Sequence, residues 1–281
     1  MDKLDSSRYL GDLAAVIWGG EAIPLHATRG GIMICLSVLG AVDLRDESGR
    51  DLTAVLVQPK RLALLSYLVI ARPGRYHRRE LLLSLFWSRS DPTTGRNSLR
   101  QALHFLRRVV GDDVIVSRGE SEIGINRDLL WCDAVAFVKL LDARATDEAM
   151  ALYRGALMPG TLIADAPEFN RWLDDERDYL RLRLKDTLES EAVVAEHDGN
   201  LALAVRARRR NSALEPLSAR VALALMQTLA NAGDRAAAIQ HATVFTRALR
   251  NELDLECDET VSSFVASLRR EPSGSRPGRA L

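Results

Sequence analysis

Polar and basic side chains recur at helical spacing in the segment that follows Asp91 and Pro92. One side of the predicted helix is apolar and consists of Leu99, Leu103, Leu106 and Val110. The opposite side is polar and consists of Asn97, Gln101, His104 and Arg108, flanked by Thr94 and Arg100. Asn, Gln and Arg side chains can bond to base edges, and Arg also neutralises phosphates. We predict that this face enters the major groove of double-stranded DNA; the alternative is an ordinary solvated helix face.

Other side chains near this face are expected to contact the DNA backbone. Thr93 and Thr94 can donate to phosphates or simply extend the helix cap. Arg107 lies toward the side of the apolar stripe and is expected to be a phosphate contact or a surface ion. Arg118 lies at a predicted hairpin tip, from which it can reach a phosphate or the minor groove. The N-terminal part of the helix is expected to reach the bases. The predicted DNA-binding set is therefore Thr93, Thr94, Asn97, Arg100, Gln101, His104, Arg107, Arg108 and Arg118.

The charge of the chain is unevenly distributed. Lys and Arg together number 38, and so do Asp and Glu, so the whole chain is neutral. Between Pro59 and Val110, however, eleven basic residues accompany only two acidic ones, Glu80 and Asp91. The remainder is therefore acidic. A basic module joined to an acidic one predicts a polyanionic partner for the first module alone.

No other chemistry is indicated by motif or spacing. The sequence lacks the glycine-rich phosphate loop, the zinc-protease helix motif and the nucleophile elbow. The five His residues never stand at metal-ligand spacing, and Cys35, Cys132 and Cys257 are far apart and odd in number. We expect no catalytic site, no metal and no cofactor. An enzyme of an unrecognised kind stays open as an alternative.

The segment 33–131 has the order of elements of a winged helix-turn-helix. Apolar, β-branched runs at 34–44 and 52–57 predict a short antiparallel sheet. Helices are predicted from Pro59 to the break at Pro73, from Arg79 to Trp87, and from Pro92 to Val110. Runs at 114–116 and 123–125 predict a hairpin that forms the wing. Residues 1–32 are predicted to be a weakly ordered leader, with Met33 as an alternative start.

The segment 132–270 is predicted to be helical throughout and to contain a repeat. The tetrapeptides at 197–200 and 231–234 both contain Gly and Asn, and their glycines stand 34 residues apart, the tetratricopeptide period. Residues 147–153 resemble a partial earlier copy. The tail 271–281 is predicted to be disordered. The predicted fold is mostly α: a winged helix-turn-helix (α+β) domain followed by an all-α tetratricopeptide-like repeat domain.

Together these residues resemble the SARP-type transcriptional activators, which join an OmpR-type winged helix to a bacterial transcriptional activator domain. In the first half the resemblance rests on 59–68, 80–82, 85–87, 96–103 and 106–108. In the second half it rests on 152–155, 166–169, 172–173, 176–177 and 214–217. It covers about residues 34–268. Gly95 inside the third helix, His77 and Arg78 at the start of the second, and a wing without Gly-Tyr depart from the family pattern.

The resemblance implies a promoter-binding activator. Its implied partners are double-stranded promoter DNA and RNA polymerase holoenzyme, with homodimers on direct repeats. No apolar run is long enough for a membrane span, so we expect no membrane partner and a cytoplasmic, nucleoid-associated protein. The alternative is a helical-repeat scaffold or adaptor that binds a protein partner, with the winged helix serving only for dimerisation. That alternative predicts no salt-sensitive affinity for DNA.

Overall fold

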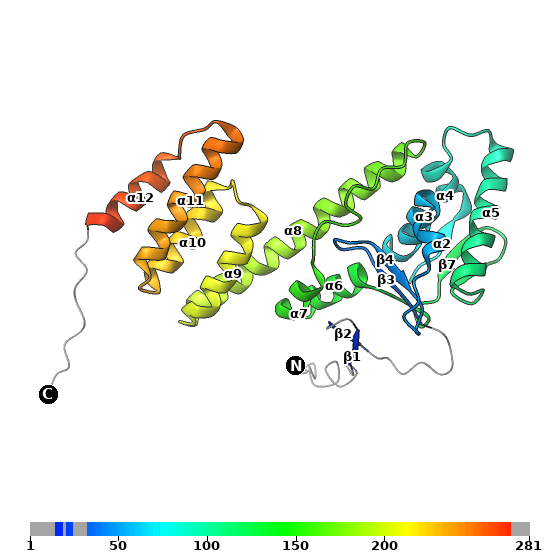
Figure 1. The fold of residues 1–281 in the computed structure, drawn as a ribbon, viewed down its shortest axis with the longest axis horizontal. Helices are drawn as coiled ribbons and strands as arrows, with labels where there is room; N and C mark the ends of the chain where they lie inside the picture. The colour runs from blue at the N-terminus through cyan, green and yellow to red at the C-terminus, as the bar shows by residue number, and fades with distance from the viewer. Residues whose placement is uncertain (1–14, 19–20, 25–32, 73, 271–281) are drawn as a thin grey trace, which may run out of the picture. The chain divides into compact units, whose positions relative to one another are not determined.

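The computed structural model describes residues 15–18, 21–24, 33–72 and 74–270. They form two compact units, one ending at Arg177 and the other beginning at Asp178, so the division falls within the long helix α8 (Pro167–His197). The first unit combines short strands with helices, whereas the described part of the second is built from helices (Figure 1). The fold class predicted from the sequence is confirmed.

The first unit contains a three-stranded sheet near the start of its winged-helix segment. Its order is β4 (Asp43–Arg45), β3 (Ile34–Ser37) and β8 (Leu130–Cys132), with β3 antiparallel to β4 and parallel to β8. The chain reverses between β3 and β4 near Gly40, which has a φ of +90°. The predicted strand at 52–57 is wrong, because this run contains helix α2 (Thr53–Leu56). Short apolar runs do not distinguish a strand from a buried helix, and here only Val55 is buried within the helix.

Three helices and a second sheet complete the winged helix. The helices are α3 (Pro59–Ile70), α4 (Arg79–Phe86) and α5 (Pro92–Val110). The sheet is antiparallel in the order β5 (His77–Arg78), β7 (Glu122–Ile125) and β6 (Ile115–Arg118). Pro59 and Pro92 each stand in the first turn of a helix, where the missing N–H costs nothing. The predicted helices and the wing hairpin therefore form, with boundaries shifted by a few residues.

Part of the predicted leader is an antiparallel strand pair. Strand β1 (Ala15–Trp18) pairs with β2 (Glu21–Pro24), which the sequence patterning did not predict. The rest of the leader apart from these eight residues, and the predicted disordered tail 271–281, lie outside the described residues.

Helices α6 (Asp133–Asp142) and α7 (Thr146–Leu152) pack within the first unit. The buried carboxylate of Asp133 accepts hydrogen bonds from the backbone N–H groups of Val38 (2.9 Å), Leu39 (3.0 Å) and Ala134 (2.7 Å). It thereby joins the end of β3 to the start of α6. The compact unit thus extends past the predicted domain boundary at 131/132, because the segment beyond it bonds back to the first sheet.

The start of α8 also packs against the winged helix. The ring centroid of Phe169 lies 4.9 Å from that of Phe86, and the centroid of Trp172 lies 4.7 Å from that of Tyr67. Arg177 donates from Nε to the carbonyl oxygen of Leu157 at 2.8 Å, which secures the loop before α8. Aromatic packing and this arginine therefore hold residues 157–177 on helices α3 and α4.

The second unit contains two helical hairpins that share the predicted repeat. The helices that follow α8 are α9 (Leu201–Leu214), α10 (Ala219–Asn231), α11 (Arg235–Leu253) and α12 (Glu259–Arg270). Gly199 and Gly233 have φ values of +74° and +83°, and each ends a helical turn. Asn200 and Asp234 then cap α9 and α11 through their side-chain oxygens. The two glycines thus perform the same role 34 residues apart, as the spacing predicted.

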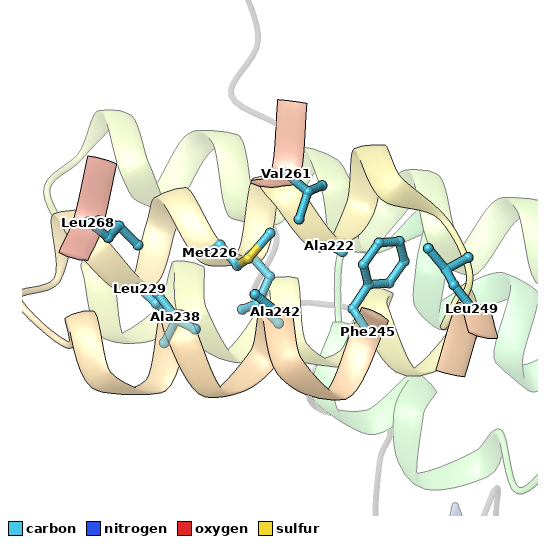
Figure 2. Packing of buried hydrophobic residues seen from close by; sticks show 10 residues of the cluster. Ala222, Met226, Leu229, Ala238, Ala242, Phe245, Leu249, Val261 and Leu268 are labelled. Carbon is cyan, nitrogen blue, oxygen red and sulfur yellow. The ribbon is translucent and has the colours of Figure 1, made fainter. Parts of the chain in front are cut away.

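The apolar core of this unit lies between α10, α11 and α12. Small and large residues both contribute: Ala238 and Ala242 of α11 lie beside Leu229 and Met226 of α10, and Phe245 lies further along α11 toward Leu249 (Figure 2). Val261 and Leu268 extend this core onto α12. Alanine at the contact positions therefore explains the close packing of the hairpin.

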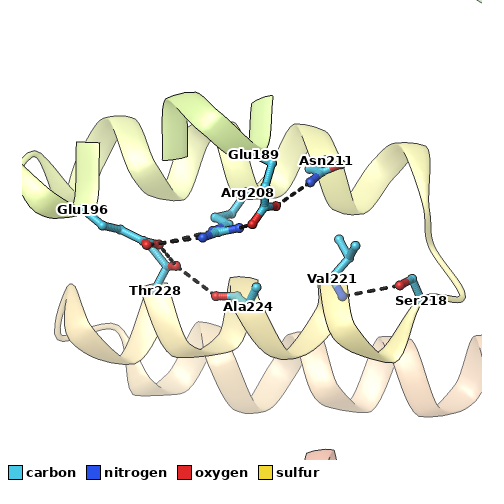
Figure 3. A network of polar contacts seen from close by, with 8 residues as sticks. All are labelled: Glu189, Glu196, Arg208, Asn211, Ser218, Val221, Ala224 and Thr228. Atoms are coloured by element: carbon cyan, nitrogen blue, oxygen red, sulfur yellow. Dashed lines mark hydrogen bonds and ion pairs between the residues drawn. The ribbon is translucent and has the colours of Figure 1, made fainter. Parts of the chain in front are cut away.

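A polar network joins α8, α9 and α10 beside that core (Figure 3). Arg208, almost fully buried, donates to Glu189 at 2.5 Å and to Glu196 at 3.2 Å. The hydroxyl of Thr228 donates to Glu196 at 2.6 Å, and Asn211 donates to Glu189 at 3.1 Å. Glu189 thus accepts two hydrogen bonds from α9, and Glu196 accepts from both α9 and α10. These bonds compensate the burial of the guanidinium.

Candidate nucleic-acid interface

Helix α5 carries a continuous exposed stripe of polar residues. The stripe consists of Thr93, Asn97, Arg100, His104 and Arg108, which follow one another at intervals of four, three, four and four residues. These intervals place the side chains in one line along the helix. Leu99, Leu103, Leu106 and Val110 are buried on the other side, as predicted. The amphipathic packing of α5 therefore fixes which face is presented to solvent.

The start of α5 is held by Asp91. Its side chain accepts from the backbone N–H groups of Thr93 at 3.1 Å and Thr94 at 3.0 Å. The side chain of Thr94 and these amides lower the pKa of Asp91 from its ordinary value. Thr93 keeps its side chain on the stripe, whereas Thr94 takes part in the cap, one of the two roles predicted for it.

Two stripe residues are linked to each other. Arg100 donates from Nη2 to the side-chain oxygen of Asn97 at 3.0 Å, and both are exposed. Within the described part of the chain, the side chains of Gln101, His104 and Arg108 have no hydrogen-bond or ion-pair partner. Donors on this face are therefore available to an external ligand.

Arg107 stands apart from the stripe. It is half-buried and donates from Nε to the carbonyl oxygen of Ile115 at 2.9 Å and from Nη2 to the hydroxyl of Ser117 at 2.9 Å. Both acceptors belong to β6, so Arg107 fastens α5 to the wing. The sequence could not show this role, because the acceptors are a backbone carbonyl and a serine beyond the helix.

Arg118 lies at the end of β6, next to the hairpin turn at Gly119. Its Nε is 2.5 Å from a carboxylate oxygen of Glu122, and its Cζ lies 4.5 Å from the ring centroid of Tyr76. The guanidinium beside Glu122 lowers the pKa of that carboxyl group. Arg118 is therefore oriented by two neighbours on the wing while its side chain stays largely exposed.

A groove beside the stripe contains residues that the sequence reasoning missed. It has a volume of about 460 Å³ and lies where the turn between α2 and α3 meets the middle of α5. It is lined by Val57, Gln58, Pro59, Lys60, Arg61, Trp87, Ser98, Gln101 and Ala102. Two consecutive basic residues in the first turn of α3, where the helix dipole disfavours them, were the available signal.

Among the described residues, no group of three His, Cys, Asp or Glu side chains is placed to hold a metal ion. Within that same part of the chain, no helix combines the length and apolarity that a membrane span requires. The exposed stripe on α5 and the groove beside it are thus the strongest candidate site.

Comparisons with known proteins agree with this architecture. Residues 133–269 match the family described as the bacterial transcriptional activator domain. The fold is similar to that of Mycobacterium tuberculosis EmbR in complex with a low-affinity phosphopeptide, with a TM-score of 0.54 and 15% sequence identity over 86% of this chain and 67% of that chain. A search of curated proteins gave no match. Both findings agree with the resemblance predicted from the sequence: residues 133–269 match a bacterial transcriptional activator domain, and the fold is similar to that of EmbR.

Proposed function

We propose that the protein binds specific promoter sequences in double-stranded DNA and activates transcription by recruiting RNA polymerase holoenzyme. Residues 33–131 form the DNA-binding domain in this proposal, and residues 132–270 form the activator domain. The observation that carries it is the exposed stripe on α5, whose donors are unengaged or linked only to each other. The segment 59–110, with eleven basic residues and two acidic ones, presents this helix, and such a helix fits the major groove.

The exposed face of α5, which comprises the stripe and the adjoining Gln101, divides into two kinds of contact. Asn97, Arg100 and Gln101 stand in the first half of α5, where side chains of a groove-bound helix reach base edges. His104 and Arg108 follow toward its C-terminus and contact phosphates. Arg118 on the wing adds a backbone or minor-groove contact. Loss of a base contact should relax specificity, whereas loss of a phosphate contact should weaken binding to all sequences alike.

The partners proposed for the regulator follow from its resemblance to the SARP-type activators. SARP-type regulators are expected to bind as homodimers on direct repeats and to contact the polymerase through the helical domain. DNA binding would place the protein at the nucleoid in the cytoplasm. Size-exclusion chromatography with light scattering, with and without a two-repeat duplex, tests dimerisation directly.

The test of the proposed function begins with capture of genomic fragments by the full-length protein. The best fragment is then titrated at about 50 and 200 mM salt against a scrambled duplex, a range over which six to ten phosphate contacts change affinity by about 10³ to 10⁵. Arg100→Ala should lose about 1 to 3 kcal/mol of discrimination between the two duplexes. Arg108→Ala should weaken both complexes equally. Lys139→Ala, on the exposed side of α6, is the matched control.

Sequence-selective, salt-dependent binding by the parent protein would support the regulator. If Arg100→Ala and Arg108→Ala both bind like the parent, the groove-facing surface has been assigned to the wrong residues. A folded protein that binds neither duplex would favour the helical-repeat scaffold, which requires no DNA affinity.

A further inference from the structure

The stripe on α5 has a neighbour on each side. On one side Arg107 bonds to β6, so the wing adjoins the helix there. On the other side Ser98, Gln101 and Ala102 face the groove formed with the turn between α2 and α3. A helix in the major groove lies between two phosphate backbones. If the wing contacts one of these DNA backbones, the protein groove beside α5 faces the other DNA backbone.

The groove presents two cations held in place by aromatic rings. Arg61 stacks with its Cζ 4.0 Å from the ring centroid of Phe105, and Lys60 Nζ lies 5.0 Å from that of Trp87. Cation–π contacts orient a charge without neutralising it. The half-buried Arg61 has no acidic partner among the described residues.

Lys60 has an acidic partner that competes for the same charge. Its Nζ lies 2.6 Å from a carboxylate oxygen of Asp165, whose side chain is 63% exposed. The Lys60 side chain is 24% exposed, so the pair is only partly exposed. Ion pairs in contact with solvent are worth about 1 kcal/mol or less, so an arriving phosphate can replace the carboxylate at small cost. Gln58, Ser98 and Gln101 add neutral polar groups to the groove wall.

From this geometry we propose that the groove is a second contact with the DNA backbone. It receives a phosphate of the strand on the side of α5 away from the wing, bound by Arg61 and by Lys60 after Lys60 exchanges Asp165 for the phosphate. This inference rests on the proposed function. It extends the interface beyond α5 and the wing to the start of α3.

The test compares Arg61→Gln in the full-length protein with Lys139→Gln, which removes one positive charge from α6, a helix that does not line the groove. The best captured duplex and its scrambled counterpart are each titrated at several salt concentrations. Removal of one phosphate contact should make the slope of log K against log salt less steep by about 0.9 for both duplexes. Lys139→Gln should keep the parent slope.

Two results distinguish an error in the groove proposal from an error in the proposed function. If the parent protein shows no salt-dependent DNA binding, both the proposed function and the phosphate contact in the groove are wrong. If the parent binds and Arg61→Gln keeps the slope of Lys139→Gln, the groove alone is overturned.

Arg61→Gln also removes the stack of Arg61 on Phe105 and could therefore disturb packing. A second variant tests the groove while this stack is kept. Gln58→Glu introduces a negative charge at the groove and removes neither cation nor ring. It should weaken binding to both duplexes several-fold, with circular dichroism melting as the check on folding. Unchanged affinity of this folded variant would overturn the proposal.

Discussion

Lys60 Nζ lies 2.6 Å from a carboxylate oxygen of Asp165, which joins the first turn of α3 to the loop before α8. The pair therefore connects the proposed DNA side of the winged helix with the loop that leads into α8, the helix that packs on it. Lys60 lowers the pKa of Asp165, so the carboxylate is charged at neutral pH.

Asp165→Asn should increase DNA affinity. The substitution removes the anion that competes with a phosphate for Lys60, so binding should tighten several-fold at low salt on specific and scrambled duplexes alike. Stability should change by less than about 1 kcal/mol, because the pair is partly exposed. Fluorescence anisotropy titration measures the effect, with Asp175→Asn on the exposed side of α8 as a control for net charge. Equal affinities for the two variants would contradict the exchange.

Asp133→Ala should destabilise the first unit by about 3 kcal/mol or more. The substitution leaves the buried N–H groups of Val38 and Leu39 without their acceptor, and an unsatisfied buried donor costs about 1 to 3 kcal/mol. Urea unfolding followed by circular dichroism measures the difference. Asp112→Ala, at an exposed position after α5, should stay within about 0.5 kcal/mol of the parent. Similar midpoints for both variants would show that the Asp133 bonds contribute little.

Leu103→Ala should cost about 2 to 5 kcal/mol of stability, because it empties a core position under the stripe. Arg100→Ala, three residues earlier and exposed, should leave the unfolding midpoint unchanged while it weakens DNA binding. Measuring stability and affinity on both variants separates the packed face of α5 from the exposed face. A large stability loss in Arg100→Ala would argue against that division.

Gly95→Ala should stabilise α5. Gly95 is buried within the helix, and an added Cβ would lie 3.5 Å from Trp87 Cβ and 3.6 Å from Leu83 Cδ2, ordinary contact distances. Alanine in place of glycine in a helix interior is worth roughly 0.5 to 1 kcal/mol. Thermal unfolding should show a higher midpoint. A lower one would mean that the neighbouring side chains cannot accommodate the methyl group.

Stability should decrease as the pH falls below about 6.5, the ordinary pKa of histidine. Burial lowers the pKa of His77, with Arg72 adding to the effect, and its Nε2 is buried without a partner. The unfolded chain therefore binds a proton at a higher pH than the folded chain, so folding is favoured above this range and loses stability below it. Urea unfolding at pH 7.5 and 5.5 measures the change.

His77→Phe should reduce that pH dependence without abolishing it, since burial also lowers the pKa of His241 in the second unit. An undiminished dependence in the variant would assign the effect to other groups.

The sequence predicted α5 and its polar face because everything that specifies them is local. Asp91 and Pro92 start the helix, and the spacing of Leu99 and Leu103 assigns its buried side. The 34-residue repeat was equally readable, since Gly199 and Gly233 each end a helix within their own turn.

Only the tertiary structure decided which of these side chains are free. Arg107 bonds to β6, and Asp133 accepts from Val38 and Leu39, which follow β3 and precede Asp133 by 95 and 94 residues. Two further interactions join residues that are distant in the sequence: β8 pairs parallel with β3, and Lys60 forms an ion pair with Asp165. Local patterning specifies a helix and its buried side, but a partner distant in the chain is chosen by packing of the whole unit. The sequence by itself therefore determined most of the elements and the resemblance to a family, and the fold determined the groove and the ion pair beside the stripe.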